Sequence, residues 1–323
     1  MTLHENKDLF SDIIDAASRS KSEGGLGILA PFIEKDYWIT RSLQMMSRAD
    51  NLENAVFKGG TSLTKGYGIG NRFSEDIDIA IADAWTFSGN QLKMLIKRTS
   101  KAMTEGLVEV VKPSTSKGSR YHKAYYSYPR IGNSQLHSYI NNGELLVEIN
   151  SFANPYPYEK RRLVSFIYDF LTVNNSEDII DEYDLHPFEI NVLDRRRTLT
   201  EKIVSLFRAS LGEDYEPNLK AKIRHFYDLH FLWEDAECKN YLTDSAFLLD
   251  FNSLIEHDRE LFKDPMGWQT RALSESPLLI NFSKVWAKLA PVYERELSSL
   301  AYAKIPDSKS VLNSVVSLLS LFR

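Results

Sequence analysis

The segment Asp76-Ile77-Asp78-Ile79-Ala80-Ile81 constrains the fold of this chain more than any other. Isoleucine alternates with aspartate or alanine, which is the period-two pattern of a β-strand with one buried face and one open face. Both aspartates must therefore point to the same side of a sheet. Neighbouring carboxylates supply the hard oxygen ligands that Mg²⁺ prefers in proteins. The segment predicts a strand whose open face carries a metal-binding pair.

A glycine pair precedes this strand and predicts a second part of the same site. The apolar run Ala55-Val56-Phe57 ends at Gly59-Gly60, which is typical of a strand that enters a tight turn, and a short helix is expected over residues 61–65. The two glycines allow the backbone to approach phosphate oxygens, and the Ser62 hydroxyl can add a contact. Nucleotidyl transfer needs a bound triphosphate and two magnesium ions, so the two motifs together favour that chemistry.

A third carboxylate is expected from a neighbouring strand, and Glu148 is the best-placed candidate for it. Strand patterns cover residues 121–128 and 145–150, with Asn141-Asn142-Gly143 in the loop between them. We expect these strands to pair as a hairpin beside the aspartate strand.

The remaining pattern predicts an α+β protein with two lobes. Helices are expected at residues 6–18, 31–46 and 89–105, and a further strand at 188–193, whereas almost everything beyond is helical. Thr198-Leu199-Thr200-Glu201 has the form of a capping box, so a helix should begin there with Lys202 in its first turn. The predicted lobes are residues 1–196, with a mixed sheet flanked by helices, and residues 197–323, mainly α-helical.

Composition excludes several classes of protein. The net charge of −5 argues against a protein that coats nucleic acid, and the single cysteine, Cys238, excludes an internal disulfide or a cysteine cluster with zinc spacing. The first twenty residues lack the pattern of a secretion signal, and no apolar run is long enough to cross a bilayer. We expect a cytoplasmic protein with no membrane partner.

One stretch departs from the overall negative charge. Residues 111–143 contain no Asp or Glu, and their lysines and arginines alternate with tyrosines. Aromatic rings can stack on bases while cations meet phosphates, so the stretch is either an RNA groove or a tyrosine-rich hairpin packed on the sheet. The basic clusters at 160–162 and 195–197 are weaker candidates of the same kind.

Several segments together resemble the AbiEii/AbiGii-type nucleotidyltransferase toxins, which include the MenT group and have a DNA-polymerase-β-type active site. Residues 57–63 and 72–79 are similar to the first two motifs of that family, 199–203 to its third with a lysine, and 224–229 to its fourth with an aspartate. The run Glu34-Lys35-Asp36-Tyr37-Trp38 is also similar to one found there. The resemblance spans residues 30 to 235.

The resemblance implies a polymerase-β-type lobe, a toxin–antitoxin or abortive-infection system with a cognate antitoxin, and transfer of NMP from an NTP to RNA, at the 3′ end of tRNA. It implies Mg²⁺, or Mn²⁺, as the cofactor. The residues that it points to are Asp76, Asp78 and Glu148 for the metal, Gly59, Gly60, Thr61, Ser62 and Lys202 for the nucleotide, and Asp76, Asp78, Lys202 and Asp228 for catalysis.

Alternatives remain for individual residues and for the acceptor. Lys202 can also extend along the boundary between lobes, and Asp228 can form an ordinary helical ion pair with Arg224, four residues before it. Fifteen residues separate Gly60 from Asp76, more than is usual in the superfamily, and Glu148 stands where many relatives use aspartate. The same metal site also suits a protein or small-molecule acceptor, and a catalytically silent regulator would keep the same fold.

Overall fold

The computed structural model describes residues 2–74, 76–131 and 143–323, and the chain divides into two compact units. The first unit comprises Met1–Tyr67 and Phe73–Leu193, and the second comprises Gly68–Arg72 and Asp194–Arg323. The main division falls between Leu193 and Asp194. The short excursion Gly68–Arg72 belongs to the second unit although first-unit residues flank it on both sides.

The described residues of the first unit form a mixed eight-stranded sheet with the order β3-β5-β6-β2-β1-β8-β7, and β4 pairs with β5. β2 is parallel to β6 and antiparallel to β1, β1 is parallel to β8, and the other pairs are antiparallel. The strands are β1 (Ala55–Lys58), β2 (Asp76–Ile81), β3 (Val108–Val110), β4 (Ser116–Lys117), β5 (Tyr121–Ser127), β6 (Glu144–Asn150), β7 (Tyr158–Leu163) and β8 (Phe188–Leu193).

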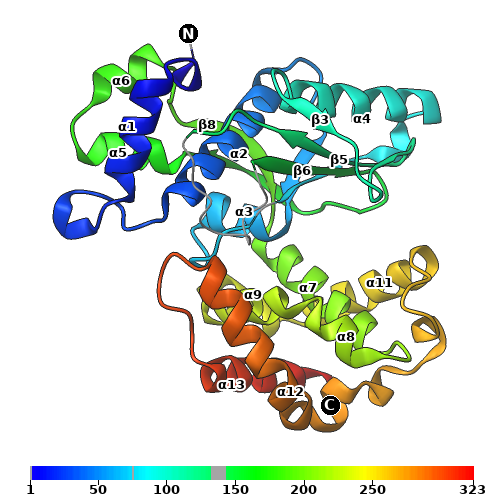
Figure 1. Cartoon of the computed structure of the whole chain (residues 1–323). Coiled ribbons are helices and arrows are strands. Elements are labelled where there is room, and N and C mark those ends of the chain that lie inside the picture. Colours follow the sequence, from blue (N-terminus) through cyan, green and yellow to red (C-terminus); the bar gives the residue numbers. More distant parts are fainter. Residues whose placement is uncertain (1, 75, 132–142) are drawn as a thin grey trace. The chain divides into compact units, whose positions relative to one another are not determined.

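One face of this sheet is a continuous apolar core. Register places His122, Ile149, Ile79, Phe57 and Val192 side by side across five strands, and all of them are buried. Helices cover this side, and α4 runs alongside β3, β5 and β6 in Figure 1. The helices of the unit are α1 (Lys7–Ser18), α2 (Ala30–Arg48), α3 (Gly59–Tyr67), α4 (Gly89–Met103), α5 (Phe166–Val173) and α6 (Glu177–Glu182).

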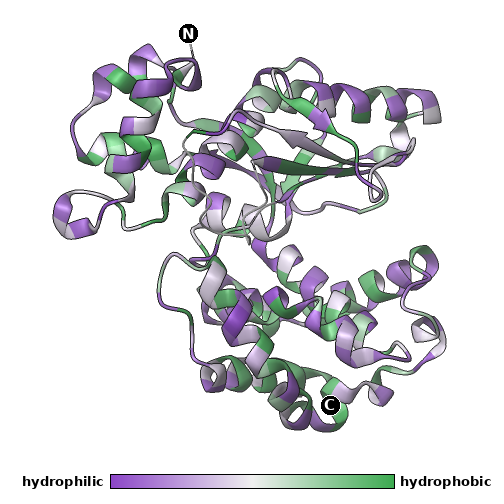
Figure 2. Ribbon diagram, viewed as in Figure 1, coloured by the Kyte–Doolittle hydropathy of each residue, from purple (hydrophilic) through white to green (hydrophobic). Residues whose placement is uncertain are grey.

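The second unit is helical. Apart from short 3₁₀ turns, its helices are α7 (Arg195–Ser210), α8 (Tyr215–Lys220), α9 (Ile223–Glu234), α10 (Ala236–Leu242), α11 (Ser245–Leu261), α12 (Pro277–Leu300) and α13 (Ser308–Leu319). Hydrophilic and hydrophobic residues alternate around them, as Figure 2 shows, because each helix buries one side in a shared core. Among the described residues, no helix has the length and apolar character needed to cross a membrane.

The predicted α+β class is confirmed, and so are the predicted helices at the start of the chain, the aspartate strand and the hairpin beside it. Asn141 and Asn142 of the predicted hairpin loop lie outside the described residues. Cys238 is a buried free thiol.

The predicted capping box at Thr198 is wrong. α7 begins at Arg195, and the Asp194 side chain caps it by accepting a hydrogen bond from the Arg196 amide at 2.8 Å. Asp194 caps the helix about one turn before Thr198, so the Thr198–Glu201 pattern lies inside the helix and not at its start. Lys202 therefore lies inside the helix and not in its first turn.

The polar run in α2 has a structural role. The Asp36 carboxylate accepts from the Lys65 ammonium of α3 at 2.5 Å and from the Phe166 amide at 2.8 Å, and all three groups are largely buried. The Lys65 ammonium also donates to the Val164 carbonyl at 3.0 Å. This ion pair fixes α3, the helix that follows Gly59 and Gly60, against α2.

We expect Asp36→Ala to lower the free energy of unfolding by about 3–5 kcal/mol, because it leaves the Lys65 ammonium buried without its carboxylate. Arg48→Ala is the control, since it breaks an ion pair whose side chains are about half exposed and should cost less than about 1 kcal/mol. Denaturant unfolding of both variants measures the difference, and equal midpoints would contradict the assigned role of Asp36.

Candidate active site

A row of charged side chains crosses the open face of the sheet in the first unit. Register places Lys58 of β1 opposite Asp78 of β2, Asp78 beside Glu148 of β6, and Glu148 opposite Lys123 of β5. All four side chains are half-buried, and Asp76 lies on the same face two residues before Asp78. The alternation predicted for β2 therefore brings both aspartates and Glu148 to one side, as expected.

Gly59 lies directly against the carboxylate of Asp78. Its φ of +82° is in the left-handed region that favours glycine, and an added Cβ would lie 2.3 Å from Oδ2 of Asp78. Any side chain at this position would displace the carboxylate. The glycine turn and the aspartate strand, which are separate motifs in the sequence, thus form one continuous surface.

The hydroxyl groups that follow the glycines are used within the unit. Thr61 Oγ1 donates to the Asp76 carbonyl at 2.7 Å, which anchors α3 to β2, and Ser62 Oγ donates to the Gly59 carbonyl at 2.9 Å. Both side chains are buried. The first amides of α3 lack intrahelical partners by geometry, so the helix offers backbone N–H groups to a phosphate. The Ser62 hydroxyl, which was predicted to contact a phosphate, is buried and donates to the Gly59 carbonyl instead.

Glu148 is held at both carboxylate oxygens. Lys123 Nζ contacts Oε1 at 2.6 Å, and the Tyr121 hydroxyl donates to Oε2 at 3.0 Å. Burial disfavours the charge on Lys123, but the hydrogen bond and the charge of Glu148 outweigh it and raise the pKa of Lys123, with a further contribution from Asp76. Burial, followed by the negative charges of Glu148 and Asp78, raises the pKa of Tyr121 well above its usual range. Both donors therefore keep their protons near neutral pH.

The donor set fits a divalent metal ion in part. Asp76 and Asp78 offer carboxylate oxygens on one open face, which suits Mg²⁺. Glu148 is already neutralised by an ammonium. Within the ranges that the structure describes, no three His, Cys, Asp or Glu side chains are gathered closely enough to hold a metal ion.

In the second unit, Asp228 of α9 is enclosed by two cations. Arg72 binds it in a bidentate manner, with Nε at 2.7 Å from Oδ1 and one terminal nitrogen at 2.8 Å from Oδ2, and Lys202 Nζ lies 2.7 Å from Oδ2. All three side chains are buried. Burial raises the pKa of Asp228, but the charges of Arg72 and Lys202 outweigh it and lower this pKa well below its usual range. The structure thus joins Lys202 to Asp228, and the partners of Asp228 are these two cations instead of Arg224.

Arg72 was not predicted from the sequence as a partner of Asp228. The excursion that carries it is fixed within the second unit: the Asn71 amide donates to the Tyr227 hydroxyl at 2.8 Å, the Tyr302 amide donates to the Asn71 carbonyl at 3.0 Å, and Arg72 forms a β-bridge with Ala301. The signal in the sequence was its position at the start of the second motif, two residues before Ser74.

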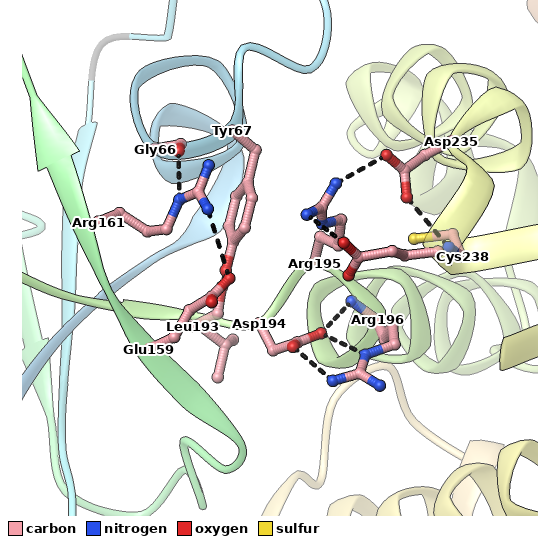
Figure 3. A network of polar contacts seen from close by, with 11 residues as sticks. Gly66, Tyr67, Glu159, Arg161, Leu193, Asp194, Arg195, Arg196, Asp235 and Cys238 are labelled. Carbon is pink, nitrogen blue, oxygen red and sulfur yellow. Dashed lines mark hydrogen bonds and ion pairs between the residues drawn. The ribbon is translucent and has the colours of Figure 1, made fainter.

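The basic cluster 160–162 lies on the edge strand β7. Arg161 Nε donates to the Gly66 carbonyl at 2.9 Å, and its guanidinium lies over the Tyr67 ring at 4.7 Å, as Figure 3 shows. This arginine supports α3 from within the first unit, although its side chain remains 34% exposed.

The basic cluster 195–197 opens α7, and its first two members contact carboxylates of the second unit. Arg195 pairs with Asp235 at 2.9 Å, and Arg196 pairs with Asp194 at 2.8 Å (Figure 3). The Asp194 hydrogen bond is the leading cause of a raised pKa for Arg196, and burial opposes it. These pairs support a structural role for the cluster.

The tyrosine-rich segment contributes both to the open face and to the core. Tyr121, Lys123 and Tyr125 of β5 point to the side of Glu148, whereas His122 and Tyr126 are buried on the other side. Three of its lysines have carboxylate partners in the first unit: Lys112 pairs with Glu144, Lys117 with Glu109 and Lys123 with Glu148. Residues 132–142 of the segment, including Tyr139, lie outside the described residues.

Comparison with known proteins bears on this site. The model of the family described as "Nucleotidyl transferase AbiEii toxin, Type IV TA system" matches residues 41–312. Among solved structures, the chain is similar in fold to the nucleotidyltransferase toxin MenT4 from Mycobacterium tuberculosis H37Rv, with a TM-score of 0.50 and 16% identity over 96% of this chain and 98% of that chain. JHP933 from Helicobacter pylori matches with a TM-score of 0.37 and 18% identity over 82% and 95% of the two chains. A search of curated proteins found no match.

The family model covers most of the chain, including the glycine turn, the aspartate strand and the Lys202 and Asp228 motifs. The expected resemblance is confirmed, and so is the expected fold, a mixed sheet flanked by helices followed by a helical C-terminal part, as in the nucleotidyltransferase toxin MenT4. This chain belongs to the AbiEii family and is a nucleotidyltransferase toxin of a type IV toxin–antitoxin system.

Proposed function

We propose that this enzyme transfers NMP from an NTP to an RNA acceptor, with the 3′ end of tRNA as the acceptor, and that it uses Mg²⁺ or Mn²⁺ held by Asp76 and Asp78. One observation carries the proposal above the others. The amide-rich start of α3 lies directly against the Asp78 carboxylate, at the contact of Gly59 with Asp78. A triphosphate bound at those amides would have its metal-binding carboxylates beside it.

The reaction follows from the chemistry of this surface. The acceptor hydroxyl oxygen forms a bond to the α-phosphorus, the bond from that phosphorus to the bridging oxygen of the β-phosphate breaks, pyrophosphate leaves, and the hydroxyl proton passes to solvent. A divalent ion, when bound, neutralises phosphate charge and favours ionisation of the acceptor hydroxyl. The start of α3 holds the triphosphate oxygens, and Asp76 and Asp78 hold the metal.

Lys202 is the proposed contact to the triphosphate from the second unit. Two cations face the single carboxylate of Asp228, so this trio carries a net positive charge that suits a polyphosphate. In the sequence, Arg72 precedes Asp76 by only four residues and belongs to the segment that is similar to the second motif of the family. Asp228 orients Lys202 and Arg72, and its low pKa keeps it an anion.

An RNA acceptor is favoured by the rings on the open face. Tyr125 is in register with Leu146, which is in register with Asp76, so this ring shares the side of the sheet that carries the aspartates. Stacking of bases on tyrosine is tolerant of sequence and suits a single-stranded 3′ end. A protein or small-molecule acceptor would use the same metal pair, and a silent regulator would need neither the aspartates nor Lys202. The family implies a cognate antitoxin as a further partner.

The direct test incubates the purified chain with Mg²⁺, each α-labelled NTP in turn, and total bacterial RNA. We expect label on RNA of tRNA size, on a denaturing gel, with one nucleotide preferred. Label only on protein would replace the RNA acceptor with a protein acceptor, and label on neither would contradict nucleotide transfer to both classes of macromolecule.

Asp76→Ala and Asp78→Ala should each reduce transfer to background, because each removes a metal ligand from an open strand face while the apolar face of β2 stays intact. Asp15→Ala, at an exposed position of α1, is the control and should keep full activity. Retained labelling by the folded double variant would refute the metal assignment.

Gly59→Ala should impair transfer by more than tenfold with the fold retained, because its Cβ would push the Asp78 carboxylate from its place. Gly106→Ala is a matched control in the same unit, since Gly106 also has a positive φ of +80° but has no atom within 4 Å of an added Cβ. Circular dichroism and initial rates distinguish the two, and equal rates would show that contact with Asp78 is unimportant.

Lys202→Ala should raise the KM for the NTP roughly 10- to 100-fold, as expected for loss of a hydrogen bond to a charged group. The fold should survive because Arg72 still pairs with Asp228.

Asp228→Asn should instead lower the free energy of unfolding by about 3–5 kcal/mol, since it leaves two buried cations without a carboxylate. Lys220→Ala, at a half-exposed ion pair of the same unit, is the control for both measurements. An unchanged KM in Lys202→Ala would remove Lys202 from the nucleotide site.

A further inference from the structure

The environment of Glu148 differs from that of a typical third metal ligand. In this structure each Glu148 oxygen already accepts from a donor: Oε1 faces the Lys123 ammonium at 2.6 Å, and Oε2 accepts from the Tyr121 hydroxyl at 3.0 Å. Both donors come from β5, the strand next to β6. The cation nearest to Glu148 is therefore supplied by the chain itself.

Lys123 is placed by the sheet and not by chance contact of flexible side chains. Residue 123 is directly opposite residue 148 in the antiparallel register, which brings their side chains together on the face that carries Asp76 and Asp78. Tyr121, two residues earlier on β5, points to the same side. The result is the order cation, anion, anion, cation across Lys58, Asp78, Glu148 and Lys123.

We propose that Lys123 supplies, on the acceptor side of the site, the positive charge that a second divalent ion would otherwise supply, so that Asp76 and Asp78 bind the one divalent ion used in catalysis. This inference rests on the proposed function. Glu148 is then a positioning residue, which holds the Lys123 ammonium on the face that carries Asp76 and Asp78.

Stability alone is a weak reason for this ion pair. The side chains of Lys123 and Glu148 are 25% and 24% exposed, and an ion pair in contact with water contributes less than about 1 kcal/mol. A lysine also has a chemical advantage over a metal at this place, because its charge is present before any ion binds. The site would need to capture one ion, together with the NTP, instead of two.

The test counts Mn²⁺ bound to the intact chain in the presence of a non-hydrolysable NTP analogue, by electron paramagnetic resonance of free Mn²⁺, and needs no catalysis. We expect Lys123→Met to bind one more Mn²⁺ than the wild-type chain, because Glu148 loses its cation and becomes a ligand. Adding Glu148→Gln to Lys123→Met should remove the extra ion, and Lys123→Arg should not gain it. Lys117→Met, which breaks the Lys117–Glu109 pair of the same unit, is the matched control and should bind as the wild-type chain does.

The single variant Glu148→Gln distinguishes most clearly between Glu148 as a positioning residue for Lys123 and Glu148 as a metal ligand. We expect it to leave the number of bound Mn²⁺ unchanged, whereas loss of one ion would show that Glu148 is a metal ligand and would overturn the proposal. An equal count in Lys123→Met and wild type would also overturn it. If Asp76→Ala and Asp78→Ala bind as much Mn²⁺ as the wild type, the metal pair of the proposed function fails instead, so the two failures are distinguishable.

Discussion

The two-residue alternation of β2 is the constraint on which the rest of the site depends. Ile77 and Ile79 are fully buried in β2, which lies between β1 and β6. Because side chains alternate along a strand, Asp76 and Asp78 must point to the opposite face of the sheet. A shift of register by one residue would put two carboxylates into the core and two isoleucines on the open face, which is a prohibitive exchange. Burial of Ile77 and Ile79 therefore fixes the side of the sheet on which Asp76 and Asp78 lie.

A second constraint is electrostatic. The Asp228 carboxylate, buried between Arg72 and Lys202, is stable as an anion only because both cations accompany it. The same arrangement limits where Lys202 can point. A lysine on a flexible surface chain loses side-chain entropy when it binds a ligand, whereas Lys202 is already held by Asp228. The ion pairs of Asp228 with Arg72 and Lys202 restrict these side chains and give their positive charges a defined position.

Local patterns predicted the parts of this protein that depend on nearest neighbours in the chain. The strand at Asp76–Ile81, the glycine turn and the hairpin of β5 and β6 all follow from periodicity, because the burial of one face decides them. β7 was not predicted, since its sequence Tyr-Glu-Lys-Arg-Arg-Leu lacks apolar alternation and it is an edge strand with little to bury. The Thr198 capping box failed for a different reason, because Asp194 offered an earlier cap.

Contacts between distant parts of the chain could not be predicted from spacing. Arg72 and Asp228 are far apart in sequence, and nothing local distinguishes their pairing from the four-residue spacing of Arg224 and Asp228. In the same way, the five basic residues of 111–143 were compatible with an RNA groove or with a hairpin packed on the sheet, and their three lysines meet glutamates from β3 and β6. Charge along the sequence predicts surface potential only where the fold does not bring in an opposite charge.

The excursion Gly68–Arg72 has a consequence for the order in which the protein is made. It leaves the ribosome early but belongs to a unit whose other residues begin at Asp194, and its anchors Tyr227, Asp228 and Ala301 are synthesised much later. Until then the residues that lead directly into the aspartate strand lack their final partners. A nascent or truncated chain that ends before these anchors therefore contains both aspartates but lacks the residues that hold Asn71 and Arg72 in place. This topology therefore links the ordering of the segment before the aspartate strand to completion of the polypeptide.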